Sequence, residues 1–247
     1  MGTLNVKDKI ALVTGANRGI GEAFVKVLLE QGARKIYAAA RDLDNLKPVI
    51  ALAPDIIEPV LLDVTDTGHI QALPEKISAL DILVNNAGIA NACNSTSDNA
   101  VEISRLEMET NLFGPMQITL ALLPQLKRSS EAAIINLSSI AGISNFPALG
   151  PYSATKAAMH SYTQGLRAEL ADTNIQVVGV YPGPIDTRMA EGFEMEKAKP
   201  EQVAIRTFIA LGEGTNDVLP DDFAEQMYNV FLEHPHNLEN AFSQMLH

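Results

Sequence analysis

The sequence predicts an α/β fold in which a doubly wound parallel sheet of about seven strands is flanked by helices on both faces. Three observations lead to this fold class. Short apolar runs alternate with longer amphipathic stretches along most of the chain. A glycine-rich turn joins the first apolar run to the first amphipathic stretch. With 247 residues, 47% hydrophobic content and no Pro-, Gly- or Ser-rich linker, residues 1–247 are expected to form one domain.

The expected strands are short segments in which nearly every residue is apolar, because strands of a parallel sheet are buried on both faces. The first such segment contains Ile10, Ala11, Leu12 and Val13 in a row. The segments of this kind are 10–14, 35–40, 57–62, 81–85, 132–138, 175–181 and a short one at 217–219.

The expected helices are stretches in which apolar residues recur three and four positions apart, the spacing of one helix face. The first helix has Ala23, Phe24, Val27 and Leu28 at this spacing and ends near Gly32. The pair Gly114-Pro115 is expected to kink or break the longest of them. The stretches are 19–31, 43–51, 67–78, 99–127, 152–171 and 200–211, followed by a helical tail at about 221–247.

The charge balance and the cysteine count limit the classes of partner. The chain has 18 Lys and Arg against 30 Asp and Glu, and a net charge of −12 argues against nucleic acid and anionic membranes. Cys93 is the single cysteine, so neither an intrachain disulfide nor a metal site is expected. Neither a signal peptide nor a membrane span is recognised, and a soluble, cytoplasmic protein is expected.

The turn after the first strand reads Thr14-Gly15-Ala16-Asn17-Arg18-Gly19-Ile20-Gly21. Glycines allow the backbone to turn tightly and to approach a pyrophosphate, and the helix N-terminus that follows offers free N–H groups and a partial positive charge. Such turns also cap ordinary helices. Its place between a buried strand and an amphipathic helix indicates a dinucleotide site.

The end of the second strand distinguishes the two nicotinamide dinucleotides. Enzymes for NAD usually have Asp or Glu there, which binds the ribose hydroxyls and would repel a 2′-phosphate. Here Ala40 is followed by Arg41, and Arg18 lies in the Gly-rich turn. Two guanidinium groups suit a phosphate dianion, so NADP(H) is predicted over NAD(H). The alternatives are that both arginines are solvated or that Asp42 pairs with Arg41.

Tyr152 and Lys156 are four residues apart and therefore share one face of a helix. A phenol titrates near ~10, and a neighbouring positive charge lowers that pKa. Ser139 lies thirteen residues upstream of Tyr152, at the end of an apolar strand, where its hydroxyl can hold a substrate oxygen. The three residues are expected to move a proton on or off an alcohol or carbonyl oxygen. On its own, a Tyr-x-x-x-Lys pattern is more often a surface Tyr and a solvated Lys.

These motifs, in this order, resemble the short-chain dehydrogenase/reductase family in its single-domain subtype. The resemblance also rests on Leu62-Asp63-Val64, Asn85-Asn86-Ala87-Gly88 and Pro182-Gly183-Pro184-Ile185-Asp186-Thr187. The basic residue in the Gly-rich turn and the Arg after the second strand resemble members that prefer NADPH, including carbonyl reductases. The resemblance implies cofactor contacts from Gly15, Asn17, Arg18, Gly19, Ile20, Gly21, Arg41, Asp63, Val64, Asn86, Ala87, Gly88, Tyr152, Lys156, Pro182, Gly183, Ile185 and Thr187.

The resemblance further implies roles for four catalytic residues. Tyr152 would be the general acid in reduction and the general base in oxidation, and Ser139 would orient the substrate carbonyl. Ser139, rather than Ser138, has the family's spacing to the Tyr. Lys156 would lower the phenol pKa and hold the nicotinamide ribose, and Asn111 would hold a water that links Lys156 to solvent. Hydride would pass between the nicotinamide and the carbonyl carbon.

The substrate pocket of this family is built from three segments, which correspond here to 89–94, 140–150 and 189–195. Their apolar residues predict a lipophilic ketone or aldehyde, and methionine often lines tolerant surfaces. Some of these side chains could instead belong to the core or to an interface. The residues expected to line the pocket are Ile89, Ile140, Phe146, Leu149, Met189 and Phe193, with Ile143 and Met195 nearby.

The C-terminus departs from the commonest family pattern, because a helical tail follows Pro220. The family often assembles tetramers through its last strand and two long helices. A homodimer or homotetramer is expected here, although the tail puts the usual tetramer in doubt. The apolar tail residues Phe231, Leu232, Phe242 and Met245 could pack on the parent domain or on a partner subunit.

The sequence therefore predicts an NADPH-dependent oxidoreductase that interconverts a carbonyl compound and its alcohol. One alternative is a reductase for a thioester-linked 3-ketoacyl substrate, which would need a basic surface to receive an acidic carrier. Another is a non-catalytic NADPH-binding regulator, which would be expected to lack part of the catalytic set. A nucleotide-sugar epimerase shares the fold, but usually has a longer chain and a Gly-x-x-Gly-x-x-Gly turn.

Overall fold

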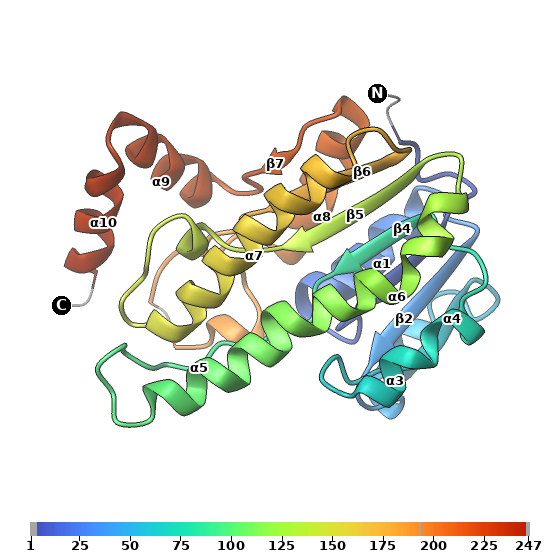
Figure 1. Cartoon of the computed structure of the whole chain (residues 1–247), viewed down its shortest axis with the longest axis horizontal. Coiled ribbons are helices and arrows are strands. Elements are labelled where there is room, and N and C mark those ends of the chain that lie inside the picture. The colour runs from blue at the N-terminus through green and yellow to red at the C-terminus, as the bar shows by residue number, and fades with distance from the viewer. Residues whose placement is uncertain (1–3, 193, 246–247) are drawn as a thin grey trace.

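The structure, a computed structural model, describes residues 4–192 and 194–245, and within them seven parallel strands form one sheet in the order β3-β2-β1-β4-β5-β6-β7 (Figure 1). This confirms the predicted fold class, and each strand agrees with its predicted bounds to within one residue. The strands are β1 (Ile10–Thr14), β2 (Lys35–Ala40), β3 (Ile57–Leu61), β4 (Ile82–Asn85), β5 (Ala132–Leu137), β6 (Ile175–Val180) and β7 (Asp217–Val218).

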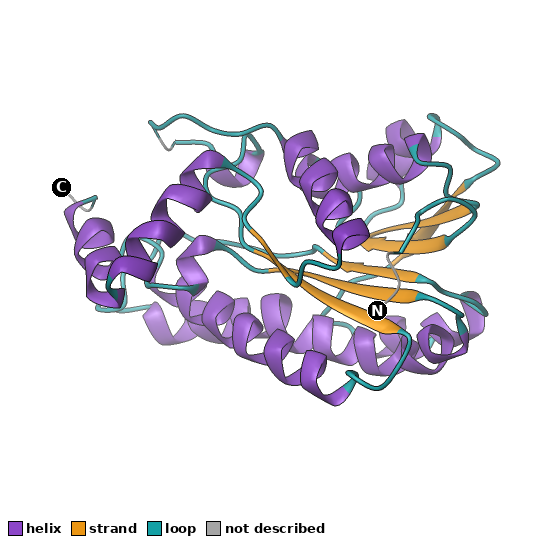
Figure 2. Ribbon diagram, turned by 90° about the horizontal axis from the view of Figure 1, so that it is seen from above, coloured by secondary structure: helices purple, strands orange, loops and turns teal. Residues whose placement is uncertain are grey.

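Helices cover both faces of the sheet (Figure 2). They are α1 (Gly19–Glu30), α2 (Lys47–Ile50), α3 (Thr67–Gln71), α4 (Leu73–Lys76), α5 (Ala100–Met108), α6 (Gly114–Arg128), α7 (Gly150–Glu169), α8 (Pro200–Glu213), α9 (Asp222–Glu233) and α10 (Pro235–Gln244).

Two apolar cores lie between the sheet and these helix layers. In β1, Ala11 and Val13 belong to the core under α1 and α8, whereas Ile10 and Leu12 belong to the core under α6 and α7. Because β1 is buried on both faces, its residues from Ile10 to Val13 are apolar without interruption, and polar and apolar residues do not alternate along the strand. The layers bring every strand's carboxyl end to one edge, where the cavity described below lies.

Three of the expected helices are interrupted, and a proline occupies the first turn after each interruption. Proline is tolerated there because its missing N–H would have no intrahelical partner. The predicted kink at Gly114-Pro115 takes this form: α5 continues through a π-helical turn, Glu109–Phe113, into α6. Asn111 lies inside that wider turn, and insertions of this kind are frequent at functional sites.

The C-terminal tail folds back on its own domain as α9 and α10, which lie beyond β7 at one end of the molecule (Figure 1). Leu238 and Phe242 of α10 are buried against Ile140, so the tail packs on the parent domain. By contrast, Leu232 and Met245 are 63% and 39% exposed. Among the residues with described placement, no helix is long and apolar enough to cross a bilayer.

Candidate active site

A cavity of about 940 Å³ opens at the carboxyl ends of the strands. Open parallel sheets bind their ligands at this edge. Every residue expected to contact the cofactor lies on the wall of this cavity. These residues are Gly15, Asn17, Arg18, Gly19, Ile20, Gly21, Arg41, Asp63, Val64, Asn86, Ala87, Gly88, Tyr152, Lys156, Pro182, Gly183, Ile185 and Thr187.

The Gly-rich turn between β1 and α1 packs too tightly for larger side chains. Gly19 has a φ of +55°, a left-handed conformation that favours glycine. A Cβ at Gly21 would overlap the Gly15 carbonyl oxygen. The turn therefore brings the free N–H groups at the start of α1 to the cavity, where they can donate to phosphate oxygens.

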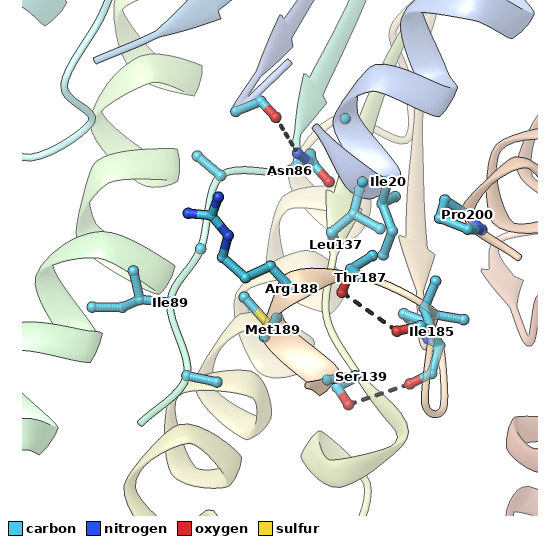
Figure 3. A pocket seen from close by; sticks show the side chains of 18 of the residues that line it. Ile20, Asn86, Ile89, Leu137, Ser139, Ile185, Thr187, Arg188, Met189 and Pro200 are labelled. Atoms are coloured by element: carbon cyan, nitrogen blue, oxygen red, sulfur yellow. Dashed lines mark hydrogen bonds between the residues drawn. The ribbon is translucent and has the colours of Figure 1, made fainter. Parts of the chain in front are cut away.

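Thr14 and Asn86 fasten this turn to the end of β4. The Thr14 hydroxyl oxygen accepts hydrogen bonds from the N–H groups of Asn86 and Ala87, at 2.9 and 3.0 Å. The Asn86 side-chain amide donates to the carbonyl oxygens of Thr14 and Gly15, at 2.8 and 3.3 Å, and Figure 3 draws one of these two bonds. The two strand ends that carry the Gly-rich turn and the Asn-Asn-Ala-Gly motif are thus held as one unit.

Arg18 and Arg41 are exposed on the wall of the cavity. Asp42, the alternative partner of Arg41, instead accepts hydrogen bonds from the Asp44 N–H and the Asn45 amide, at 2.9 and 3.0 Å. Within the described ranges, no ion pair joins Arg18 or Arg41 to a carboxylate. Both guanidinium groups can therefore face an anionic group in the cavity.

Asp63 follows β3 and shares the cavity wall with Arg41. Burial acts to raise the pKa of Asp63, but hydrogen bonds from the Thr65 N–H and hydroxyl, at 2.9 and 2.8 Å, act to lower it. The charges of Arg41 and His69 add to this lowering, so the pKa lies below its ordinary value. The Asp63 carboxylate is therefore ionised and can accept a hydrogen bond from a donor such as an exocyclic amino group.

Ser139, Tyr152 and Lys156 converge on one side of the cavity. Lys156 is 4% exposed, and its Nζ donates to the Leu137 carbonyl oxygen at 2.7 Å. The same Nζ lies 5.5 Å from the centre of the Tyr152 ring. The end of β5 and one face of α7 thus hold a hydroxyl, a phenol and an ammonium group around one point.

The two serines after β5 have different partners. Ser138 donates to the Lys156 carbonyl oxygen at 2.9 Å, which joins β5 to the backbone of α7. Ser139 donates to the Pro182 carbonyl oxygen at 3.3 Å (Figure 3). The longer bond of Ser139 is the easier one to exchange for a substrate oxygen, and the choice of Ser139 over Ser138 stays a prediction.

The electrostatics of the Tyr152 phenol differ from the prediction that Lys156 lowers its pKa. Burial raises the pKa of Tyr152 to about 12, a hydrogen bond with Ser139 opposes this, and the Glu107 charge adds to it. Burial also lowers the pKa of Lys156 to about 8, against the charge of Glu107. The predicted lowering is therefore not found, because burial has the largest effect on the phenol and the Ser139 hydrogen bond opposes it only in part.

Asn111 lies behind the catalytic group and not on the cavity wall. Its amide donates to the Ile89 carbonyl oxygen and the Thr155 hydroxyl, at 2.9 and 3.0 Å, and its oxygen accepts from the Ile89 N–H at 2.8 Å. Gly88 separates it from Lys156: a Cβ at Gly88 would be 3.1 Å from Asn111 Oδ1 and 3.8 Å from Lys156 Nζ. The role of Asn111 in holding a water stays a prediction.

Glu107 is a buried carboxyl that the sequence pattern does not reveal. One oxygen accepts from the N–H and the side-chain amide of Asn91, at 2.7 and 3.0 Å. The other has no hydrogen-bond partner among the described residues. Burial raises the pKa of Glu107, opposed by the Asn91 hydrogen bonds and by the Lys156 charge. Its sequence signal is an acidic residue on the buried face of an amphipathic helix.

Apolar side chains line the part of the cavity beside Tyr152. Ile89, Ile140, Phe146, Leu149 and Met189 contribute to the wall, as the sequence predicts, and so does Met195. Phe193, the sixth residue expected there, lies outside the described residues. Ile143 does not contribute to the wall, because it packs in the apolar cluster under α9 and α10.

Several residues of the cavity wall are not predicted from the sequence, among them Arg188, Phe223 and Phe242. Phe223 and Phe242 come from the C-terminal helices, which the family pattern does not place at the pocket. Arg188 belongs to a short 3₁₀ turn, Arg188–Ala190, and projects toward the segment between Asn86 and Ile89 (Figure 3). In the described part of the chain, no group of three His, Cys, Asp or Glu side chains could hold a metal ion.

Replacing Lys156 with Met is expected to stabilise the folded protein at neutral pH. The pKa of Lys156 is about 8 in the folded protein against 10.5 ordinarily, so its burial as a cation costs about 3 kcal/mol below pH 8. From about pH 8 to 10.5 the unfolded chain binds the extra proton, so stability rises with pH and this cost disappears. Met is similar in length and carries no charge.

Thermal unfolding of Lys156→Met and the unaltered protein tests this expectation. The lost hydrogen bond to Leu137 offsets part of the gain, so the net stabilisation at neutral pH should be about 1–2 kcal/mol. The difference in Tm should shrink as the pH rises toward 10.5. A lower Tm for the variant at neutral pH would show that burial of the charged Lys156 does not lower the free energy of unfolding.

Known proteins resemble this chain over most of its length. A profile described as short chain dehydrogenase matches residues 9–198. An uncharacterized oxidoreductase of Staphylococcus aureus (strain N315) is 36% identical over 212 residues, covering 83% of this chain and 91% of that protein. An uncharacterized oxidoreductase of Staphylococcus epidermidis is 35% identical over 213 residues, covering 83% of this chain and 92% of that protein.

Two crystal structures resemble the whole fold. A short chain dehydrogenase from Burkholderia cenocepacia in complex with NADP has a TM-score of 0.90 and 33% identity, covering 97% of this chain and 99% of that one. A short-chain dehydrogenase from Streptomyces avermitilis has a TM-score of 0.85 and 26% identity, covering 97% of this chain and 98% of that one.

Proposed function

This chain belongs to the short-chain dehydrogenase family, and we propose that it is an NADPH-dependent oxidoreductase of the carbonyl reductase or alcohol dehydrogenase type. It would transfer hydride between nicotinamide and a lipophilic ketone or aldehyde, or the corresponding alcohol. The observation that carries the proposal is that Ser139, Tyr152 and Lys156 meet on one side of the cavity whose wall includes all the expected cofactor residues.

NADP(H) is the proposed cofactor because one arginine lies in the Gly-rich turn and another is the first residue after β2. Arg18 and Arg41 are exposed on the cavity wall, and Asp42 is engaged with Asp44 and Asn45. A 2′-phosphate would give both guanidinium groups a charge-assisted hydrogen-bond acceptor. The NADP complex of the Burkholderia cenocepacia enzyme, at 33% identity, supports the same choice.

The proposed reduction combines a hydride with a proton from the protein. The residues of the Gly-rich turn and Lys156 would hold NADPH, which when bound would supply the hydride for the carbonyl carbon. Tyr152 donates its phenolic proton to the carbonyl oxygen, so the carbonyl becomes an alcohol and the phenol a phenolate. Ser139 donates a hydrogen bond to the same oxygen and orients it. Lys156 stabilises the phenolate that forms, because its positive charge lies beside the ring.

Reduction and oxidation are expected to differ in pH dependence. With a pKa of about 12, Tyr152 stays protonated at neutral pH, the form that acts as the acid in reduction. Oxidation needs the phenolate, whose fraction rises about tenfold per pH unit below the pKa. The oxidation rate should therefore rise as the pH rises toward the pKa of Tyr152. Over the same pH range, titration of Tyr152 should not lower the reduction rate. Rates in both directions on one ketone and its alcohol test this, and a pH-independent oxidation rate would contradict it.

The apolar wall supports a lipophilic substrate. Ile140, Phe146, Leu149 and Met189 offer no charge to a sugar or a polyanion. The proposal is tested with a panel of ketones and aldehydes graded by size and polarity, following oxidation of NADPH, with NADH in parallel. Turnover of bulky apolar carbonyl compounds with NADPH alone is expected. NADPH binding without turnover of any member would favour the regulatory alternative.

Assembly and location are also proposed from the resemblance and the composition. We propose one catalytic domain that works in the cytoplasm as a homodimer or homotetramer. Exposed apolar side chains on α5, the π-helical turn and α6 support an interface there, because monomeric surfaces seldom expose such groups together. These side chains are Val101 at 66%, Leu106 at 51%, Phe113 at 42% and Leu120 at 63% exposed.

A further inference from the structure

The C-terminal helices and the segment before α7 share a separate apolar cluster. Ile140 of that segment is buried with Ala224 and Met227 of α9 and with Leu238 and Phe242 of α10. Half-buried apolar residues at its edge include Phe146 and Phe223. The tail is therefore packed on the part of the chain that leads into the helix of Tyr152.

Phe242 is a residue of the tail that contributes to the wall of the cavity. It is 1% exposed, and its ring meets the Phe146 ring edge to face, with 5.5 Å between centroids and an angle of 86°. Phe146, Phe223 and Phe242 all contribute to the wall of the cavity. Three aromatic side chains from three separate segments, two of which belong to the tail, therefore line one cavity.

Asp221 ties the tail to the segment that follows β6. Its side chain is buried at 2% exposure, and one oxygen accepts from the Ala224 N–H at 2.9 Å as the N-cap of α9. The other oxygen accepts from the Gly183 N–H at 2.8 Å. Gly183 and Tyr152 line the same cavity. The start of α9 is therefore positioned by the backbone of the cofactor cavity itself, which fixes where Phe223 enters the wall.

We propose that α9 and α10 form a substrate-selecting wall, in which Phe242 seated on Phe146 favours carbonyl compounds that carry an aromatic ring next to the carbonyl group. Aromatic rings prefer edge-to-face or offset contacts with one another, so a planar ring gains more against this wall than a flexible alkyl chain does. The proposal rests on the proposed function, since it names the class of carbonyl compound that the site reduces.

The test compares acetophenone with 2-butanone, a ketone without a ring, as substrates of the full-length enzyme with NADPH. The ratio of their kcat/KM values is measured for the unaltered enzyme, Phe242→Ala, Phe242→Leu and Leu232→Ala. Leu232 is the matched control, because it lies on α9 but is 63% exposed. Phe242→Leu keeps an apolar side chain in the cluster, so it remains informative where Phe242→Ala loosens α10.

Phe242→Ala is expected to lower the acetophenone to 2-butanone ratio by on the order of tenfold, chiefly through a higher KM for acetophenone. Phe242→Leu should give an intermediate ratio, and Leu232→Ala should leave it unchanged. Turnover of both ketones with an unchanged ratio in both Phe242 variants would overturn this proposal and leave the proposed function standing. Turnover of neither ketone by the unaltered enzyme would overturn both.

Discussion

Replacing Tyr152 with Phe is expected to lower kcat by about 10²–10⁴-fold while the Kd for NADPH changes by no more than a few fold. The substitution removes one hydroxyl, the group that gives its proton to the carbonyl oxygen. The ring remains to fill its place between Ser139 and Lys156 on the cavity wall. Steady-state turnover of a ketone and fluorescence titration of NADPH measure the two quantities separately.

Tyr162→Phe is the matched control for this substitution. Tyr162 lies on the same helix, α7, but packs against the core under α6 and α7 and does not line the cavity. The Tyr162→Phe variant should therefore have a kcat within about twofold of that of the unaltered enzyme. Undiminished turnover in Tyr152→Phe would remove Tyr152 from the proposed mechanism, whereas equal losses in both variants would point to a general effect on the fold.

Replacing Arg41 with Asp is expected to weaken NADPH binding by about 10²-fold and to reverse the preference in favour of NADH. The change removes one guanidinium group from the proposed 2′-phosphate site and puts a carboxylate at the end of β2. A carboxylate there accepts hydrogen bonds from the free ribose hydroxyls of NADH and repels a phosphate. The ratio of kcat/KM for the two cofactors, with one ketone at a fixed concentration, measures the preference.

Arg34→Asp controls for the change in net charge. Arg34 is exposed just before β2, at the amino end of the strand, whereas the cavity lies at the carboxyl end. The two variants therefore have the same net charge, and a long-range effect would appear in both. An unchanged preference for NADPH in Arg41→Asp would refute the phosphate role of Arg41 and leave Arg18 as the remaining candidate.

The strands and the cofactor residues could be predicted because each depends on local sequence. A strand buried on both faces is an apolar run, and Ile10–Thr14 is found where that run predicts it. The Gly-rich turn has its glycines where the backbone is left-handed or tightly packed, as at Gly19 and Gly21. Since parallel strands end at one edge, residues that follow different strands lie on the wall of one cavity.

Other features depend on contacts between segments far apart in the sequence. The tail has helical periodicity, but nothing in that periodicity shows that Phe242 meets Phe146 or that Asp221 accepts from the Gly183 N–H. The wider turn around Asn111 was expected as a kink, because Gly114-Pro115 marks a change in the helix but not its form. Predicting these contacts and the form of this turn requires the three-dimensional structure.

The protonation of the catalytic pair also could not be read from spacing. Tyr152 and Lys156 share a helix face, as predicted, yet burial raises the pKa of Tyr152 to about 12 and lowers that of Lys156 to about 8. The size of a desolvation effect depends on what surrounds both groups, including Glu107 on another helix. Spacing along a helix predicts which groups are neighbours, but it does not predict how far each group is removed from water.

The most direct test of the proposed function follows the hydride itself. The enzyme is incubated with acetophenone and NADPH deuterated at the transferring C4 position, and the alcohol product is analysed by mass spectrometry and NMR. Transfer of one deuterium to the carbinol carbon by the unaltered enzyme, and its loss in Tyr152→Phe, is the predicted result. Alcohol formed without deuterium at that carbon, or equal transfer in Tyr152→Phe, would contradict the proposed mechanism.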